Sequence, residues 1–579
     1  MAAGGRRSGD DRPLPLGVGV ALVVAVGLVA VACGSASDGA VGADVDRPPD
    51  PSIEHVQLVD VASEVGLDFR HGAFRWDTTG DPNAMMGAGL CWLDHDDDGW
   101  LDLFVVNTWS EGEWGRWYDE GALPIARLYH NDRGRFTDVT AETGVGLEVR
   151  GNGCVAGDLD GDGLTDLYVT TERENVLLWN EDGERFVADD GSAGVNTPGW
   201  QAGAAIGDVN NDGLQDLFVA GYANLNGPIA GADKGFPNTF QAEPDLLFLN
   251  QGAEPGQRPA FVDVAAEVGI EAAQIDYGLG AMFTDVDRDG DLDLYVANDT
   301  HPNRLYVTRL DPDSPLGFTL DEQGEAAEVA DENAGMGVAS GDYDEDGRPD
   351  LVVTNMARQG HAVFRSIEGE EPPTFAFSLN EMRLADLGRG RTGWGATWAD
   401  LDLDTDLDLL LAHGSIPVRD LVDDREQLQA FENLTSSGER GAFTEVTDTV
   451  GLDRSGLHLA RGLAAADYDN DGDVDVAVGT IGSPLALLRN TGAGGHSLVV
   501  AADPPTPGTI VAVTTADGTT VERELIAGSS YLSSEDPRAH IGLGENDVAT
   551  VRVTWSDGRQ AVVADVDADQ VLTVEPDES

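Results

Sequence analysis

Basic residues are scarce in this chain of 579 residues, and lysine is almost absent from it. Lys234 is the only lysine, and the 34 lysines and arginines face 105 acidic residues, which gives a formal net charge of −71. Phosphate binding requires a basic face, so this balance excludes nucleic acid as a natural partner. It also argues against attraction to an anionic membrane surface.

Recognisable catalytic motifs are missing as well. The chain contains no nucleophile-elbow pattern, zinc motif or cofactor fingerprint, so we assign no catalytic residue. Cysteine occurs only three times. Cys91 and Cys154 each precede an acidic loop in consecutive repeats. They are either two small buried residues on inner strands or a disulfide between adjacent repeats, which an oxidising compartment would permit.

The third cysteine, Cys33, ends an apolar run from Leu16 to Ala32 that follows three arginines. This pattern resembles a bacterial lipoprotein signal over residues 1–33, with Cys33 as the lipidated first residue of the mature chain. Ala30 stands where such signals usually have Leu, so ordinary secretion and a retained membrane anchor remain alternatives. All three place the folded part outside the cytoplasm, and we expect membrane contact only through the lipid anchor. Residues 34–52 lack apolar periodicity and are predicted to be a flexible linker.

Aspartate, by contrast, recurs in a fixed arrangement. In the stretch from Asp158 to Asp166, the first, third, fifth and ninth residues are acidic, the sixth is Gly, and an apolar strand follows. The arrangement returns six more times, opening at Asp94, Asp208, Asp285, Asp342, Asp400 and Asp467. Closely packed carboxylates resist ionising together, which predicts a hard divalent cation with oxygen ligands, and Ca²⁺ fits best. An EF-hand is excluded because the twelfth position is Val or Leu instead of the Glu that an EF-hand needs.

Each predicted calcium site takes side-chain oxygens from the first, third and fifth positions, the backbone carbonyl of the seventh and a bidentate carboxylate from the ninth. The predicted ligands are Asp94, Asp96, Asp98, Trp100 and Asp102; Asp158, Asp160, Asp162, Leu164 and Asp166; Asp208, Asn210, Asp212, Leu214 and Asp216; Asp285, Asp287, Asp289, Asp291 and Asp293; Asp342, Asp344, Asp346, Arg348 and Asp350; Asp400, Asp402, Asp404, Asp406 and Asp408; and Asp467, Asp469, Asp471, Asp473 and Asp475. Thr405 occupies the Gly position of the sixth loop, so we expect that site to be the weakest.

The loops lie within a longer repeat. A Gly-rich strand precedes each loop, and an apolar strand, a short strand ending near Asn and a strand beginning with Phe follow in most copies. Four antiparallel strands repeated seven times predict an all-β, seven-bladed β-propeller over residues 53–490, with a linear array of calcium-loop modules as the alternative. Residues 56–61 should then supply the outer strand of the last blade and close the ring. The insertions 107–124 and 221–244 either carry binding residues or pack onto the blade edge.

Residues 491–579 contain no acidic loop and are predicted to form a small β domain. The loops with their Gly-x-Gly strands resemble the FG-GAP or VCBS repeats of integrin α-subunit propellers. Through Gly528–Ser534 and Val553–Arg559, the tail resembles an ASPIC/UnbV domain. Together these features resemble the bacterial relatives of cartilage acidic protein.

That resemblance implies a calcium-stabilised, non-enzymatic binding or adhesion protein at the cell surface or secreted, whose partner is an unknown protein or glycan. An extracellular polysaccharide lyase or hydrolase on the same scaffold, and an assembly factor of the periplasm or cell wall, are the alternatives.

Overall fold

The computed structural model describes residues 52–577 apart from 233–234, 255, 271–275, 370–372, 386 and 493. The predicted lipoprotein signal with Cys33, and residues 34–51 of the predicted linker, lie outside the described residues. Within the described part of the chain, no helix is long and apolar enough to cross a bilayer.

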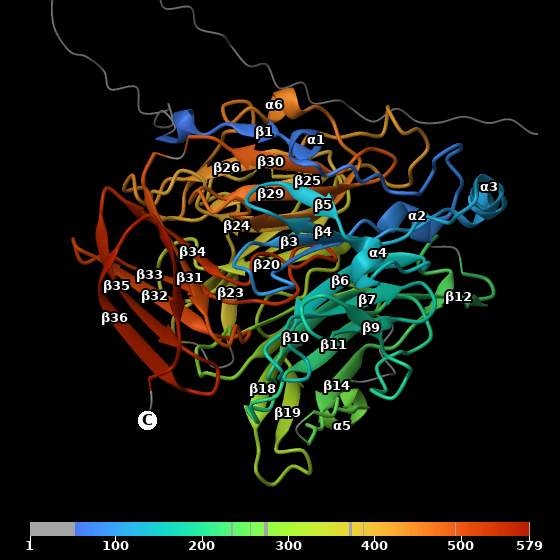
Figure 1. The fold of residues 1–579 in the computed structure, drawn as a ribbon, viewed down its shortest axis with the longest axis horizontal. Helices are drawn as coiled ribbons and strands as arrows, with labels where there is room; N and C mark the ends of the chain where they lie inside the picture. Colours follow the sequence, from blue (N-terminus) through green and yellow to red (C-terminus); the bar gives the residue numbers. More distant parts are fainter. Residues whose placement is uncertain are drawn as a thin grey trace, which may run out of the picture. The chain divides into compact units, whose positions relative to one another are not determined.

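Seven four-stranded antiparallel sheets follow one another along the chain from residue 58 to residue 490 (Figure 1). In each, an aspartate loop joins the first strand to the second. In chain order the sheets comprise β2 (Leu90–Leu93), β3 (Asp102–Val105), β4 (Arg127–Asn131) and β5 (Phe136–Asp138); β6 (Gly151–Gly157), β7 (Asp166–Thr171), β8 (Val176–Asn180) and β9 (Phe186–Ala188); β10 (Gln201–Gly207), β11 (Asp216–Gly221), β14 (Leu246–Asn250) and β15 (Phe261–Asp263); β16 (Gly278–Thr284), β17 (Asp293–Asn298), β18 (Arg304–Leu310) and β19 (Phe318–Glu322); β20 (Gly335–Gly341), β21 (Asp350–Asn355), β22 (Ala362–Ile367) and β23 (Thr374–Phe377); β24 (Gly393–Ala399), β25 (Asp408–His413), β26 (Gln429–Asn433) and β27 (Phe443–Glu445); and β28 (Ala460–Ala466), β29 (Asp475–Thr480), β30 (Ala486–Asn490) and β1 (Leu58–Asp60).

The first strands of these sheets form a closed ring. Each packs against the first strand of the next sheet, and β28 of the last sheet packs against β2 of the first. The ring closes as predicted, because β1 pairs with β30, with Leu58 opposite Asn490 and Asp60 opposite Leu488. The predicted fold class, an all-β chain of propeller type, is confirmed.

Short helices mark the connections between sheets. Single helical turns follow several outer strands, and three of these turns end at a glycine in the left-handed region. One of these glycines is Gly66 (φ +104°), where a Cβ would lie 2.3 Å from the carbonyl oxygen of Phe136 in the next sheet. The helices are η1 (Ser52–His55), α1 (Ala62–Val65), α2 (Pro82–Met86), η2 (Glu111–Glu113), α3 (Trp114–Glu120), α4 (Thr140–Thr143), α5 (Ala265–Val268) and α6 (Leu452–Ser455). The insertion 107–124 forms η2 and α3, and the insertion 221–244 forms a hairpin of β12 (Ala223–Pro228) and β13 (Phe240–Ala242).

Cys91 and Cys154, whose pairing the sequence leaves open, form a disulfide with Cα atoms 6.2 Å apart. Both residues are buried on neighbouring first strands, β2 and β6. The bond therefore ties the first two sheets together.

The C-terminal residues form two further sheets around a separate apolar core. One contains β34 (Ala539–Gly544), β31 (His496–Ala502) and β37 (Gln570–Val574), and the other contains β33 (Thr520–Glu524), β32 (Ile510–Thr515), β35 (Val548–Thr554) and β36 (Gln560–Asp567). β31 and β37 run parallel, and the other pairs are antiparallel.

Residues 527–534, which we call the central segment, run from this C-terminal domain onto the inner strands of the ring. The Ser530 N–H donates to Val338 O on β20 (2.7 Å) and the Ser534 N–H donates to Leu90 O on β2 (3.1 Å). Backbone N–H groups of β6 and β10 donate in turn to carbonyl oxygens of the segment. The segment thus bonds to strands from opposite parts of the ring.

The fit of the central segment explains part of the glycine pattern. At Gly89 a Cβ would lie 2.0 Å from Leu532 O, and at Gly153 it would lie 2.7 Å from Leu532 Cβ. Gly337 is closed off by the adjacent sheet, because a Cβ there would lie 2.0 Å from Trp394 O. Close approach of neighbouring first strands is therefore one cause of the glycines, and the central segment is a second.

Candidate metal centres

All seven aspartate loops follow one backbone course. Their fourth and sixth residues lie in the left-handed region, as shown by Gly161 (φ +75°) and Gly163 (φ +91°) in the second loop. Thr405 adopts the same conformation (φ +93°) without the freedom of glycine. The strain predicted for the sixth loop is thus present in the backbone.

Two carboxylates hold each turn. In the second loop, Asp158 accepts hydrogen bonds from the backbone N–H groups of Asp162 (3.2 Å) and Gly163 (2.9 Å), and Asp162 accepts one from Leu164 (2.9 Å). The equivalent bonds recur in the other six loops. In the first, second, fourth and fifth loops, three aspartates offer oxygens that lie within 4.8 Å of one another, close enough to share a cation.

The ninth aspartate is buried and connects the loop to the sheet. Asp166 Oδ1 accepts from the Asn180 N–H (2.8 Å) at the end of the third strand, and Asp166 Oδ2 accepts from the Leu159 N–H (3.1 Å). Burial raises the pKa of Asp166 well above its usual range. In two loops one oxygen of this aspartate, Asp350 Oδ2 or Asp475 Oδ2, is buried without a hydrogen-bond partner. A bidentate role for this position stays a prediction.

The asparagine that ends most third strands is a structural residue whose role sequence reasoning missed. Asn180 Nδ2 donates to His95 O in the preceding loop (2.8 Å) and to Thr165 O in its own loop (3.3 Å). The same double contact recurs at Asn131, Asn250 and Asn433, and Asn490 Nδ2 likewise donates to Leu401 O of the preceding loop. The regular recurrence of this asparagine in the sequence was the signal that could have indicated its role. Each such asparagine links two adjacent loops around the ring.

The loop electrostatics favour a bound cation. Burial first, and neighbouring carboxylates second, raise the pKa of Asp160 to about 6, while burial and the neighbouring carboxylate of Glu524 raise the pKa of Asp285 to about 7. In the second loop, oxygens of Asp158, Asp160 and Asp166 lie within 4.8 Å of one another, and comparable groups occur in other loops. These oxygen-only donors fit Ca²⁺, which when bound would offset the repulsion between carboxylates.

The sixth and seventh loops also contact the C-terminal domain. The Arg523 guanidinium donates to Thr405 O (3.1 Å), and the Gly544 N–H donates to Leu403 O (2.8 Å). At the seventh loop, Arg538 Nη2 donates to Asp467 O (2.9 Å). The fourth loop makes such a contact as well, because the Asp285 N–H donates to Glu524 Oε1 (3.2 Å). At least three of the seven candidate sites therefore contact the C-terminal domain.

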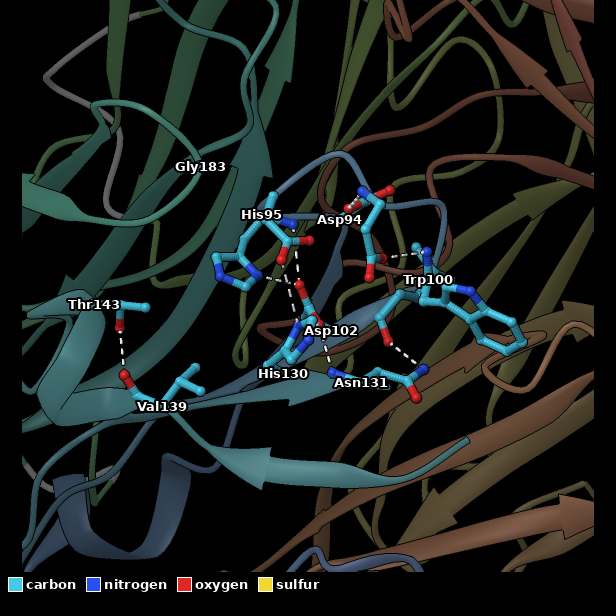
Figure 2. A network of polar contacts seen from close by, with 12 residues as sticks. Asp94, His95, Trp100, Asp102, His130, Asn131, Val139, Thr143 and Gly183 are labelled. Atoms are coloured by element: carbon cyan, nitrogen blue, oxygen red, sulfur yellow. Dashed lines mark hydrogen bonds and ion pairs between the residues drawn. The ribbon is translucent and has the colours of Figure 1, made fainter. Parts of the chain in front are cut away.

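The first loop differs from the rest in its donors. Its second residue is His95, which lies with His130 of β4 beside Asp102 (Figure 2). Burial alone would raise the pKa of Asp102, but the two histidines outweigh burial and hold that pKa below its usual value. This is the one ninth-position aspartate whose pKa is lowered.

Comparison with known families agrees with this geometry. The FG-GAP-like repeat model matches residues 94–169, 158–219 and 285–353, and the ASPIC and UnbV model matches residues 501–579. The chain is therefore a protein of FG-GAP-like repeats followed by an ASPIC/UnbV domain.

It is homologous, at modest identity, to cartilage acidic protein 1. The Mus musculus protein is 26% identical over 337 residues, which cover 57% of this chain and 41% of that protein. The Homo sapiens protein is 26% identical over 320 residues, which cover 55% of this chain and 38% of that protein. The chain thus spans about two fifths of the length of the curated relatives it matches.

Among solved structures, the chain is similar to an Agrocybe aegerita lectin that recognises non-reducing terminal N-acetylglucosamine. The match covers 64% of this chain and 89% of the lectin chain. Its sequence identity is 14% and its TM-score is 0.37. A likeness at this level carries no argument about the ligand of this chain.

Proposed function

We propose that this protein is a calcium-binding, non-enzymatic adhesion-type protein that acts outside the cytoplasm. The observation that carries the proposal is the shared geometry of seven aspartate loops, each placed where a sheet meets its neighbour. Calcium in these loops would stabilise the ring by neutralising carboxylates that otherwise repel one another. The ring would then serve as a rigid support for binding surfaces.

Two features support a location outside the cytoplasm. The Cys91–Cys154 disulfide is of the kind that persists in oxidising compartments. The amino-terminal pattern ending at Cys33 resembles an export signal. Lipidation at Cys33 remains part of the proposal.

The insertion 107–124 offers a binding surface for a protein or a glycan. Trp114 and Tyr118 stack with ring centroids 5.5 Å apart, and they are 47% and 68% exposed. Helix α3, which carries both residues, has no buried residue, so its aromatics do not serve the core of the protein. Exposed, rigid aromatic side chains are typical anchors of binding sites.

Calcium binding is tested on the full chain after dialysis. We expect bound calcium by elemental analysis and a lower melting temperature in excess EGTA. Asp160→Asn in the second loop should remove about one calcium per chain, whereas Asp182→Asn, an exposed acid outside the loops, should leave the calcium content unchanged. A metal-free protein with the same melting temperature in EGTA would contradict the proposal.

The binding surface is tested separately. Affinity capture from the native cell surface and a glycan array should both be run with wild type, with Trp114→Ala/Tyr118→Ala and with Val562→Ala, which alters an exposed apolar residue of the C-terminal domain. We expect only the double variant to lose its partner. Capture that survives this double substitution would exclude α3 as the binding surface.

A further inference from the structure

The first loop brings together four side chains of mixed chemistry. His95 follows β2 in the loop, Asp96 is the next residue, Asp102 begins β3 and His130 lies on β4. One nitrogen or oxygen from each lies within 4.8 Å of the corresponding atoms of the other three. Figure 2 shows His95, Asp102 and His130 turned toward one another.

The two histidines are peculiar to this repeat. The residue equivalent to His95 is Leu159, Val209, Val286, Tyr343, Leu401 or Tyr468 in the other six loops, and each of these is buried among apolar neighbours. The residue before the strand-ending Asn is Trp179, Leu249, Glu432 or Arg489 elsewhere, and never His. His95 therefore occupies a packing position with a polar ring, whose Nδ1 contacts Asp102 Oδ2.

The spacing of His130 Nδ1 from the two carboxylates matches that of donor atoms in tetrahedral coordination. Bonds from zinc to histidine nitrogen or carboxylate oxygen are about 2.0–2.2 Å long, so donor atoms of a tetrahedron lie about 3.3–3.6 Å apart. His130 Nδ1 lies 3.2 Å from Asp102 Oδ1 and 3.6 Å from Asp96 Oδ2. This nitrogen is buried and faces both carboxylates.

The donor types distinguish this site from the other six. Imidazole nitrogen suits Zn²⁺ and its neighbours in the first transition row, whereas Ca²⁺ takes oxygen ligands. Two carboxylates balance the charge of one divalent ion, and the two imidazoles bind in their neutral form. We propose that His95, Asp96, Asp102 and His130 form a binding site for a transition-metal ion of the Zn²⁺ class. The proposal assigns a different ion to the first loop, whose Asp96 and Asp102 are also predicted calcium ligands, and it leaves the other six loops to Ca²⁺.

The test uses the full chain, stripped of metal and then supplied with excess Ca²⁺. Zn²⁺ is titrated calorimetrically, and Co²⁺ is added in parallel because tetrahedral Co²⁺ with nitrogen ligands absorbs visible light. We expect one Zn²⁺ or Co²⁺ per chain that excess Ca²⁺ does not displace. Zinc binding should also release protons from the histidines, which titrations in two buffers would reveal.

Two variants separate ligation from folding. His95→Leu restores the residue found in the second and sixth loops, and His130→Gln keeps a polar side chain on β4. Each should weaken Zn²⁺ binding by more than the roughly 10–100-fold that loss of a supporting hydrogen bond costs, and each should remove the Co²⁺ absorption. His496→Gln, which alters an exposed histidine of the C-terminal domain, should change neither.

Absence of the Co²⁺ band in wild type, or Zn²⁺ binding that persists unchanged in both variants, would overturn the proposal. Calcium content measured on the same samples keeps the two metal proposals apart. The oxygen-only loops predict no Co²⁺ band, so either proposal can fail while the other stands.

Discussion

Exchanging the residues at the sixth position of two loops would test whether backbone strain distinguishes the sixth loop. Thr405 and Gly163 occupy equivalent positions with nearly the same φ, +93° and +91°. Thr405→Gly should therefore relieve strain in one loop, and Gly163→Thr should introduce it in the other. The two loops serve as controls for each other.

The magnitude follows from the surroundings of each residue. A left-handed conformation costs an L-residue about 1–2 kcal/mol, whereas the extra freedom that glycine gives the unfolded chain offsets about 0.4–1 kcal/mol. At Gly163 a Cβ would meet nothing within 4 Å, so no outside contact adds to this cost. At Thr405 the main-chain bonds to Asp400 and Arg523 persist in the glycine variant. We expect changes of about 0.5–1 kcal/mol in the free energy of unfolding, stabilising for Thr405→Gly and destabilising for Gly163→Thr.

Urea denaturation in saturating Ca²⁺ measures both changes, and calorimetric Ca²⁺ titration shows whether the relieved sixth loop binds more tightly. Opposite signs for the two variants are the expected result. Shifts of the same sign, or a Thr405→Gly protein that unfolds more easily, would refute the view that left-handed strain is what sets the sixth loop apart.

Three further predictions follow. Cys91→Ala/Cys154→Ala should lower the free energy of unfolding by about 4 kcal/mol, because the disulfide closes a loop with a sequence separation of 63 residues; an unchanged urea midpoint would contradict this. In saturating Ca²⁺, acidification from pH 7 to pH 5 should destabilise the fold by about 2 kcal/mol for each of His361 and His413. Burial lowers the pKa of both histidines (His361 to about 3), whereas histidines of the unfolded chain take up protons below about pH 6.5. His413→Gln should therefore flatten the pH dependence of the unfolding midpoint. In EGTA, by contrast, the melting temperature should rise as the pH falls from 8 to 7. Burial raises the pKa of Asp285 and Asp467 to about 7, so the folded state binds more protons than the unfolded state in this range. Ca²⁺ should abolish this rise in melting temperature.

Much of the ring could be predicted from the sequence because its signals are local. Nine consecutive residues specify each aspartate turn, and strand alternation specifies the sheet that follows. The closing strand Leu58–Asp60 was also predictable, since residues 56–61 precede every aspartate loop and could supply the outer strand that the last sheet needs. Periodic patterns of this kind report which residues lie on one element and in what order.

Features that depend on distant segments were beyond reach. His95 and His130 lie far apart in the chain and meet only through the pairing of β3 with β4, so neither reads as a ligand in the sequence. The Cys91–Cys154 bond depends on the placement of two neighbouring first strands. The central segment reads as a polar loop of a small domain, and nothing in its own periodicity indicates that it contacts the ring.

The placement of the central segment bears on how the protein is made. The strand Leu58–Asp60 is synthesised before any sheet, its partner β30 follows only near residue 490, and the residues that fill the middle come later still. A nascent chain released before Ser534 would leave inward-facing amides such as those of Ile206 and Cys154 unmatched. Native assembly of the ring must therefore wait until Ser534 has been translated, and a stop codon ahead of it would leave the first strands without the segment that bonds to them.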